Sequence, residues 1–429
     1  MKHFLNFKIR TIYFTLLAVS FYYLANFFNI YFAETLFLFL VILFLLYYLF
    51  DISNFDSYKV NCKKILYSLF INFIIFFIIF LIFANNRVNV IYFFLLYSVI
   101  QITLKYFLAF FNKKHISVAI LGIDSPTDKI IEILNKINKF EYVGYIDNEN
   151  STFSNYLGKI ENIEEIVKEN NIQEIIFTSR KVVKKYADLI VELKLKGITI
   201  VDYLGFLEKE EGKVDIDKID SLWILMSDGF ESFNTNFQKR IKRAFDLILA
   251  VIIGICSLPV MIISAIIVKL ESPGPVIYSQ ARIGENQKEF YVHKFRSMRN
   301  DAEKNGAKWA VENDPRVTKY GNFMRKTRID ELPQIWNVLK GEMSFIGPRP
   351  ERQVFITEIE KVVPYYNLRH SIKPGLTGWA QVMYPYGASI EDAKEKLEYD
   401  LYYIKHQDFI LDIIIMFKTV QTVIFGKGR

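Results

Sequence analysis

The ten residues 325–334, RKTRIDELPQ, place two adjacent carboxylates, Asp330 and Glu331, directly after three cationic side chains. Pro333 and an apolar run follow, and proline is tolerated in the first turn of a helix because the early N–H groups lack intrahelical partners. We therefore expect Asp330 at or near the N-cap of a helix that ends around Lys340-Gly341. The positive end of that helix favours an ionised carboxylate and a phosphate beside it.

A carboxylate held ionised among cationic side chains can attack a phosphorus centre, provided that the charge of the substrate is neutralised. Taken alone, residues 325–334 are better explained by an Asp N-cap with solvated basic neighbours. The rest of the sequence reverses that balance, because it supplies further cations and a membrane context.

Basic residues that could neutralise phosphate are spread over several segments of the last third of the chain. Alternation over residues 290–298 places Lys294 and Arg296 on one face of a strand. Arg325 precedes the carboxylates, and the rigid Gly-Pro-Arg-Pro loop presents Arg349 for bidentate phosphate contact. This distribution suits a substrate with more than one phosphate. Nucleic acid is the competing ligand, but a nucleic-acid binder has no evident use for neighbouring membrane segments.

The composition indicates membrane segments joined to a basic cytosolic part. The chain has 429 residues, 52% of them hydrophobic and 16% aromatic, with a net charge of +7, and its length predicts two or three domains. Cys62 and Cys256 are its cysteines, so neither a disulfide framework nor a zinc site is supported. The basic N-terminus leads into a long apolar region without a small-residue cleavage site, so we expect no cleavable signal peptide.

Four membrane spans are expected within residues 1–112. Residues 11–50 have the length for two helices, interrupted by a polar interval near 29–34, and apolar blocks follow at 65–83 and 90–111. Lysines and arginines lie before the first span, between the second and third, and after the fourth, which places both ends of the bundle in the cytoplasm. Lys105 is expected to snorkel to the nearby cytoplasmic end. The bundle therefore indicates an anchor or dimerisation element, not a transport pathway.

Residues 113–206 alternate between predicted strands and amphipathic helices, which predicts a doubly wound, mainly parallel sheet. A dinucleotide site would need a Gly-rich turn after the first strand, whereas this turn has Gly122 alone and Asp124 where a pyrophosphate would lie. We expect a degenerate Rossmann-like domain without NAD, serving regulation or assembly; a plain spacer is nearly as good an explanation. Residues 207–236 are expected to be an irregular linker.

The apolar run at 244–268 is long enough to span a membrane, but two features favour a re-entrant helix. Basic clusters lie on both sides of it, which places both ends in the cytoplasm, and Pro259 interrupts its middle. A helix that bends at Pro259 and returns to the same leaflet satisfies both observations. The alternative is a fifth span, which would place the charged remainder outside the cell.

From about residue 242 to 417 the sequence resembles the bacterial sugar transferases that act as polyprenol-phosphate phosphoglycosyl transferases. The family often has Ser directly before the proline of its re-entrant helix, whereas Leu258 stands there in this chain, with Ser257 one residue earlier. The motifs that carry the resemblance are Lys242-Arg-Ala-Phe-Asp, Ser272-Pro-Gly-Pro, Lys294-Phe-Arg-Ser-Met, Asp330-Glu-Leu-Pro-Gln, Asn337-Val-Leu-Lys-Gly-Glu-Met-Ser, Gly347-Pro-Arg-Pro-Glu and Lys373-Pro-Gly-Leu-Thr-Gly-Trp-Ala-Gln-Val.

The resemblance implies a long-form enzyme of the bacterial inner membrane that initiates capsule, exopolysaccharide or O-antigen repeat units. Such an enzyme transfers a sugar-1-phosphate from a UDP-sugar to undecaprenyl phosphate and releases UMP, with Mg²⁺. Asp330 would be the nucleophile that forms a covalent phosphosugar intermediate and a metal ligand, with Glu331 as its partner. The residues expected to bind the substrate phosphates are Lys294, Arg296, Arg325 and Arg349.

The expected fold is then a membrane α-helical bundle (1–112), an α/β Rossmann-like domain (113–206), a linker (207–236) and an α/β monotopic catalytic domain (237–429). The re-entrant helix at about 244–268 would keep the catalytic domain on the cytoplasmic face of a multi-pass protein. Two other hypotheses compete: a membrane-tethered NAD-dependent nucleotide-sugar dehydratase or epimerase, and a non-catalytic scaffold for polysaccharide assembly. The identity of the sugar, and whether the chain forms a homodimer, are left open.

Overall fold

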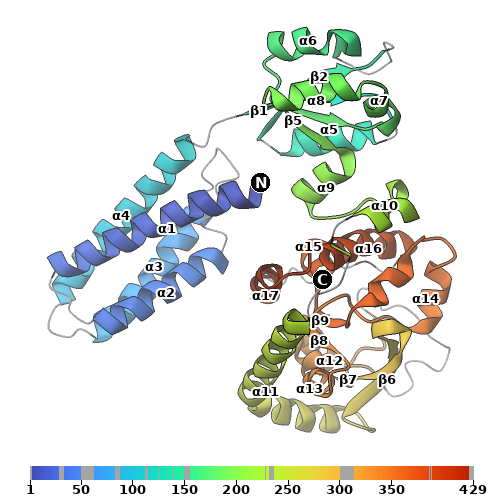
Figure 1. Ribbon diagram of the computed structural model, residues 1–429. Helices are drawn as coiled ribbons and strands as arrows, with labels where there is room; N and C mark the ends of the chain where they lie inside the picture. The colour runs from blue at the N-terminus through green and yellow to red at the C-terminus, as the bar shows by residue number, and fades with distance from the viewer. Residues whose placement is uncertain are drawn as a thin grey trace. The chain divides into compact units, whose positions relative to one another are not determined.

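The computed structural model describes residues 2–28, 33–49, 62–82, 87–111, 115–124, 126–137, 139–148, 155–227, 229–230, 236–299, 314–385, 387 and 389–424. The described chain separates into two compact units, one formed by residues 1–210 and the other by residues 211–429. The first holds a helical bundle and a parallel sheet (Figure 1). The second contains the carboxylate pair, Asp330 and Glu331.

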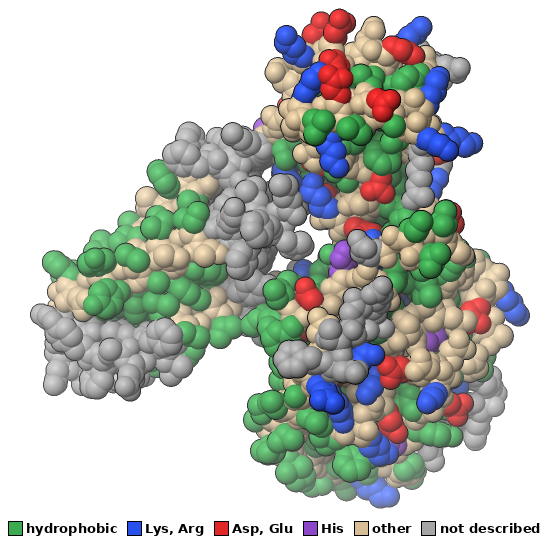
Figure 2. Space-filling model, viewed as in Figure 1, with side chains coloured by type: hydrophobic (Ala, Val, Ile, Leu, Met, Phe, Trp, Pro, Cys, Tyr) green, Lys and Arg blue, Asp and Glu red, His purple; other side chains and the backbone are tan. Residues whose placement is uncertain are grey.

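Four helices form at the predicted membrane spans: α1 (Lys2–Phe27), α2 (Ala33–Leu49), α3 (Cys62–Ile82) and α4 (Arg87–Phe111). Of the described residues in this unit, Val88–Leu108 is long and apolar enough to cross a membrane, whereas Thr11–Phe27 and Ser68–Phe80 are apolar but shorter. Their outward faces carry exposed hydrophobic side chains, as Figure 2 shows, including Tyr22, Phe70 and Tyr92. An apolar exterior of this kind is typical of a lipid-facing surface. The spanning of all four helices stays a prediction.

The inner face of α4 corrects the expectation for Lys105. Phe93, Tyr97, Gln101 and Lys105 follow one another at intervals of four, so they share one face of the helix, and all four are buried. The Nδ2 of Asn72 on α3 donates to Gln101 Oε1 at 2.9 Å, which places polar groups in this interior. Lys105 therefore lies inside the bundle, because its helical register overrides its closeness to the helix end.

The sheet formed by strands within residues 116–202, called the middle sheet below, confirms the predicted parallel α/β arrangement. Its order is β3-β2-β1-β4-β5 and every described pairing is parallel. The short strand β3 lies at one edge of the sheet, and two short helices, α7 and α8, lie between β4 and β5 in the chain. The strands are β1 (Ile116–Leu121), β2 (Phe140–Ile146), β3 (Tyr156–Gly158), β4 (Glu174–Phe177) and β5 (Thr199–Asp202), and the helices are α5 (Thr127–Lys136), α6 (Ile163–Glu169), α7 (Arg180–Lys185) and α8 (Ala187–Leu195).

The expectation of an irregular linker is wrong for residues 207–226. They form the end of α9 (Tyr203–Glu211), a short 3₁₀ helix η3 (Ile216–Lys218) and α10 (Ser221–Met226). In the second unit, the amide of Val214 donates to the carbonyl of Glu398 at 3.1 Å, and the carbonyl of Gly212 accepts from Trp379 Nε1 at 2.7 Å. Because these partners lie far along the chain, no local sequence pattern predicts the contacts.

The second unit begins with α11 (Asn236–Glu271) and the antiparallel hairpin of β6 (Ile277–Ile283) and β7 (Glu289–Phe295). A two-stranded parallel sheet joins β8 to β9. The remaining elements are η4 (Glu285–Gln287), α12 (Lys319–Thr327), η5 (Ile329–Gln334), α13 (Ile335–Lys340), β8 (Ser344–Ile346), α14 (Gln353–Ile359), η6 (Tyr366–Ser371), β9 (Gly375–Thr377), α15 (Trp379–Met383), α16 (Ile390–Lys405) and α17 (Phe409–Ile424).

Helix α11 continues through Pro259 without interruption, and its ribbon bends part-way along (Figure 1). Proline removes the hydrogen bond to the carbonyl four residues earlier, which permits such a bend. Ser257 Oγ donates to the carbonyl of Gly254 at 3.4 Å, so this serine bonds within the preceding turn.

Both halves of α11 contact the rest of the unit, because Asp246 accepts from the Ser344 hydroxyl at 3.0 Å and Val268 packs beside Phe295. Between these anchors, most of the apolar side chains face outward, and Gln238–Glu271 meets the length and hydropathy of a membrane span. Figure 2 shows this hydrophobic surface at the lower edge of the view. A re-entrant path through one leaflet stays a prediction that the bend supports.

Candidate active site

The carboxylate pair lies in the first turn of a helical segment. Helix α12 ends at Thr327, Arg328 adopts a left-handed backbone with φ +60°, and η5 then begins at Ile329. Asp330 and Glu331 are the second and third residues after this cap, close to the predicted position. The segment continues as α13 to Lys340 and ends at Gly341, as predicted, where φ is +86°.

Glu331 is the anchor of a charge cluster. Its Oε1 lies 2.6 Å from Arg349 Nη2, 3.2 Å from Lys294 Nζ and 3.7 Å from Arg328 Nη1. Burial opposes its ionisation, but Arg349 and Lys294 outweigh that cost and hold the pKa of Glu331 well below its ordinary value. Burial likewise lowers the pKa of Lys294, and Glu331 opposes that shift. Glu331 thus stays ionised and brings two of the predicted phosphate-binding cations together.

Asp330 has the opposite electrostatic character. Burial, followed by the neighbouring charge of Glu331, raises the pKa of Asp330 to about 6, against the attraction of Lys294, Arg325 and Arg328. Its Oδ1 is buried and has no hydrogen-bond partner in the part of the chain that the structure describes. The raised pKa differs from the expectation of a carboxylate stabilised by its cations, because desolvation is the larger effect. At neutral pH the side chain is still mainly ionised, and one oxygen is not engaged.

The other two predicted cations have different positions. Arg325 Nε donates to Ser297 Oγ at 2.8 Å, and its charge acts on Asp330. Arg296 is buried just after β7, and its guanidinium donates to the carbonyls of Pro273 at 2.8 Å and Ser272 at 2.6 Å. These bonds fasten the chain that leaves α11, and phosphate binding by Arg296 stays a prediction. Of the two cations Lys294 and Arg296, Lys294 is the one that contacts the carboxylate pair.

Sequence reasoning missed Gln381 in α15. Its Oε1 accepts a hydrogen bond from Arg349 Nη1 at 3.0 Å, so it contacts the same guanidinium as Glu331. The sequence feature that could have indicated Gln381 is its position within the motif that begins at Lys373. A neutral glutamine among many charged residues gave no chemical reason to select it.

The donor set permits Mg²⁺ only with help from a substrate. Among the described residues, no group of three or more His, Cys, Asp or Glu side chains could hold a metal ion. Mg²⁺ at phosphate-transfer sites usually takes one or two carboxylates and completes its shell with water and substrate phosphates. The unpartnered Oδ1 of Asp330 fits that requirement, whereas Glu331 Oε1 is already occupied by cations.

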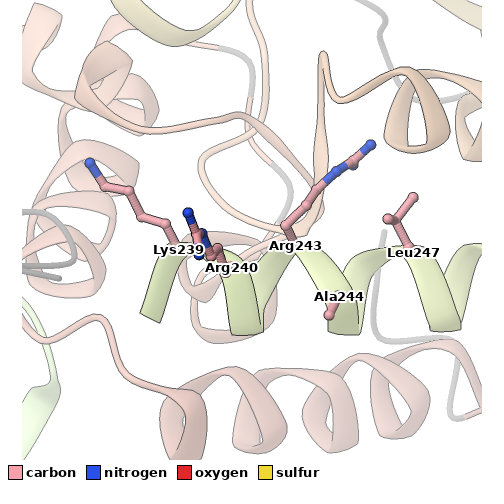
Figure 3. Close-up of a pocket in the computed structure, with 5 residues that line it drawn as sticks. All are labelled: Lys239, Arg240, Arg243, Ala244 and Leu247. Carbon is pink, nitrogen blue, oxygen red and sulfur yellow. The ribbon is translucent and has the colours of Figure 1, made fainter. Parts of the chain in front are cut away.

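A separate open hollow of about 530 Å³ lies along the beginning of α11 (Figure 3). Its lining residues are Lys239, Arg240, Arg243, Ala244 and Leu247, and neither member of the carboxylate pair is among them. Arg243 Nη1 donates to the carbonyl of Val338 at 2.6 Å, which ties this part of α11 to the end of α13. The hollow is thus distinct from the carboxylate site.

A buried carboxylate with a free oxygen, beside a second carboxylate that gathers cations, defines a site suited to phosphoryl transfer. Comparison with known proteins agrees: the family model described as "Bacterial sugar transferase" matches residues 237–426. The chain belongs to the bacterial sugar transferase family.

Three relatives illustrate the match. The UDP-N-acetylgalactosamine-undecaprenyl-phosphate N-acetylgalactosaminephosphotransferase of Aeromonas hydrophila is 47% identical over 188 residues, 44% of each chain. The UDP-glucose:undecaprenyl-phosphate glucose-1-phosphate transferase of Escherichia coli (strain K12) is 44% identical over 185 residues, 43% of this chain and 40% of the relative. The exopolysaccharide production protein PSS of Rhizobium leguminosarum bv. phaseoli is 40% identical over 195 residues, 44% of this chain and 98% of the relative. The match thus spans less than half of the first two relatives and nearly all of the third.

Proposed function

We propose that this protein transfers a sugar-1-phosphate from a UDP-sugar to undecaprenyl phosphate and releases UMP, as the first membrane step in the synthesis of a capsule, exopolysaccharide or O-antigen. The observation that carries the proposal is the free, buried Oδ1 of Asp330 beside a Glu331 that holds Arg349 and Lys294. The names of the two transferases that match this region supply the substrate classes.

In the proposed first step, a carboxylate oxygen of Asp330 attacks the phosphorus that carries the sugar. A new aspartyl O–P bond forms while the P–O bond to UMP breaks, and UMP leaves with the electron pair. In the second step a phosphate oxygen of undecaprenyl phosphate attacks the same phosphorus, and the aspartyl O–P bond breaks to restore the carboxylate. Two half-reactions at one side chain predict ping-pong kinetics.

The surrounding residues would position the reacting groups and neutralise charge. Glu331 fixes Arg349 and Lys294 through bonds of 2.6 and 3.2 Å, so both cations are held in place before the substrate arrives. Arg325 and Arg328 add positive charge near Asp330. Mg²⁺, held by Asp330 and substrate phosphates, would supply additional neutralisation of the diphosphate.

The proposed membrane placement follows from the surface of α11. With its outward apolar side chains inserted in one leaflet, the anchors at Asp246 and Val268 would hold the unit against the membrane surface. The basic flanks of this helix favour the cytoplasmic face. There, a lipid phosphate at the membrane surface could reach a protein-bound phosphosugar without leaving the bilayer.

The test is UMP release by the full-length protein in detergent, with undecaprenyl phosphate, Mg²⁺ and a panel of UDP-sugars. We expect one or a few UDP-sugars to give UMP in an amount equal to the lipid-linked product. Absence of UMP with every donor would contradict the proposal and favour a scaffold role. The panel also identifies the sugar.

A further inference from the structure

Gln381 lies two hydrogen bonds from the carboxylate pair. Arg349 Nη2 donates to Glu331 Oε1 at 2.6 Å, and Arg349 Nη1 donates to Gln381 Oε1 at 3.0 Å. One guanidinium therefore joins Glu331 in η5 to Gln381 in α15. Because arginine has donors only, the amide oxygen of Gln381 must face Arg349, which fixes the orientation of the carboxamide.

The nitrogen of the same carboxamide is left without an acceptor. Gln381 Nε2 is buried and makes no hydrogen bond within the described residues. A buried N–H group without a partner is destabilising, and native structures tolerate few of them. At the edge of a site for phosphate chemistry, such a donor indicates an acceptor oxygen that arrives with the substrate.

The segments that lead to Arg349 and to Gln381 are hydrogen-bonded to one another. The amide of Gly347 donates to the carbonyl of Thr377 at 2.9 Å, and the amide of Gly375 donates to the carbonyl of Pro348 at 2.9 Å. The chains approach so closely that a Cβ at Gly378 would lie 2.2 Å from the Gly347 carbonyl oxygen. This packing keeps Gln381 in a fixed position relative to Arg349, as a preorganised donor requires.

We propose that Gln381 is a substrate-binding residue whose amide N–H donates to a non-bridging oxygen of the phosphoryl group that is transferred. This inference rests on the proposed function, in which that phosphorus lies at Asp330. In a nucleoside diphosphate the group corresponds to the β-phosphate, because UMP, which retains the α-phosphate, is the leaving group. The neutral amide would complement the charges of Arg349 and Lys294 by fixing the orientation of the phosphoryl group.

The experiment measures binding of UDP and UMP to the full-length protein by calorimetry in detergent with Mg²⁺. UDP carries the β-phosphate and UMP does not, so the pair isolates the proposed contact. We expect Gln381→Met to weaken UDP binding about tenfold to a hundredfold, because a hydrogen bond to a charged group is lost. UMP lacks the β-phosphate and cannot make the proposed contact, so its affinity should change by no more than about twofold. Unchanged UDP affinity, or equal losses for UDP and UMP, would overturn the proposal.

Gln381→Glu separates direct contact from an effect through Arg349. The carboxylate still offers an acceptor to Arg349 but has lost the amide donor. We expect Gln381→Glu to lose at least as much UDP affinity as Gln381→Met. Recovery of wild-type affinity in Gln381→Glu would show that Gln381 only positions Arg349, which would overturn a substrate contact.

A parallel assay of UMP release by the wild-type protein keeps the two proposals distinguishable. UMP release together with wild-type UDP binding by Gln381→Met would retain the transferase and remove the Gln381 contact. UDP binding that depends on Gln381, in a protein that releases no UMP, would retain the contact and remove the transfer reaction.

Discussion

Asp147, which follows β2 in the parallel sheet, and Asp330, which lies in η5 before α13, are both carboxylates in turns, but their oxygens are engaged differently. Asp147 follows β2, where its Oδ2 accepts from the amide of Ile123 at 2.8 Å and its Oδ1 accepts from the amide of Asn148 at 2.6 Å. Asp330, by contrast, has an oxygen that is buried and not hydrogen-bonded in the described structure. Asp147 joins the turns that follow β1 and β2, whereas Asp330 has an unpartnered oxygen that can contact a substrate.

This difference shows why the fold of the middle domain does not assign it a nucleotide. Parallel α/β sheets bind ligands at the carboxyl ends of their strands, yet here those ends bond to one another. Thr178 Oγ1 donates to the carbonyl of Gly122 at 2.8 Å, and Asp147 holds the neighbouring Ile123 amide. The polar groups of the first turn are therefore partly used within the loop. The expected absence of NAD stays a prediction.

Asp330→Asn gives the largest expected effect and tests the unengaged carboxylate directly. Loss of the nucleophile should lower UMP release by at least about a thousandfold, because the remaining cations can bind but not attack the phosphorus. The assay is UMP release with the preferred UDP-sugar, with membrane insertion as the control. Full activity in a correctly inserted variant would exclude Asp330 as the nucleophile.

Glu331→Gln tests the other half of the pair. It removes the carboxylate that holds Arg349 and Lys294, so kcat should fall about a hundredfold, similar to loss of one preorganised electrostatic group.

In the wild-type protein, activity should decline as the pH falls through about 6, because Asp330 must be ionised to attack.

The acid limb of the Glu331→Gln profile should move to lower pH. Burial and then the Glu331 charge raise the pKa of Asp330, so removal of that charge lowers it. The measurement is kcat/KM against pH for both proteins. An acid limb that stays in place or moves upward would contradict the electrostatic coupling of the pair.

Asp330→Asn should also make the protein more stable at neutral pH. Folding raises the pKa of this buried carboxyl from 3.8 to about 6. The folded protein therefore binds the proton more tightly than the unfolded chain does. The stability that results is fully present below pH 3.8 and is lost as the pH rises through 6. Asparagine stays neutral, so the variant should gain about 1–3 kcal/mol at pH 7.5, and the gain should shrink toward pH 4. Thermal unfolding at both pH values measures this, and a less stable variant at pH 7.5 would count against a desolvated carboxylate.

Asp147→Ala should have the smallest effect on catalysis. Two backbone N–H groups lose their acceptor, so the middle domain should lose about 1–3 kcal/mol of stability. UMP release per folded molecule should stay within about twofold, since hydrogen bonds in the Asp147 loop do not involve the reacting groups. A loss comparable to that of Glu331→Gln would show that the two regions are functionally coupled.

Local patterns in the sequence predicted the helices and the parallel sheet well. Alternating strands and helices gave the sheet, and the apolar run with Pro259 gave a helix that bends. Residues 207–226 were missed because the groups that order them, Trp379 and Glu398, lie more than a hundred residues later. Long-range burial of this kind leaves no period in the local sequence.

The site was predicted in its residue types but not in its electrostatics. Lys294 and Arg349 do gather at the carboxylate pair, whereas Arg296 bonds to backbone carbonyls in a buried position. The raised pKa of Asp330 depends on how deeply the turn is buried, which spacing alone does not give. Gln381 was overlooked because its importance arises from one unpartnered nitrogen in the folded chain.

The most direct measurement follows the transferred phosphoryl group on the protein itself. The full-length chain is mixed with its UDP-sugar in the absence of undecaprenyl phosphate and analysed by intact-protein mass spectrometry. We expect a mass increase equal to one sugar phosphate, located at Asp330, which disappears when undecaprenyl phosphate is added. UMP release that needs the lipid acceptor from the start, on a chain that never carries the sugar phosphate, would contradict a covalent mechanism at Asp330.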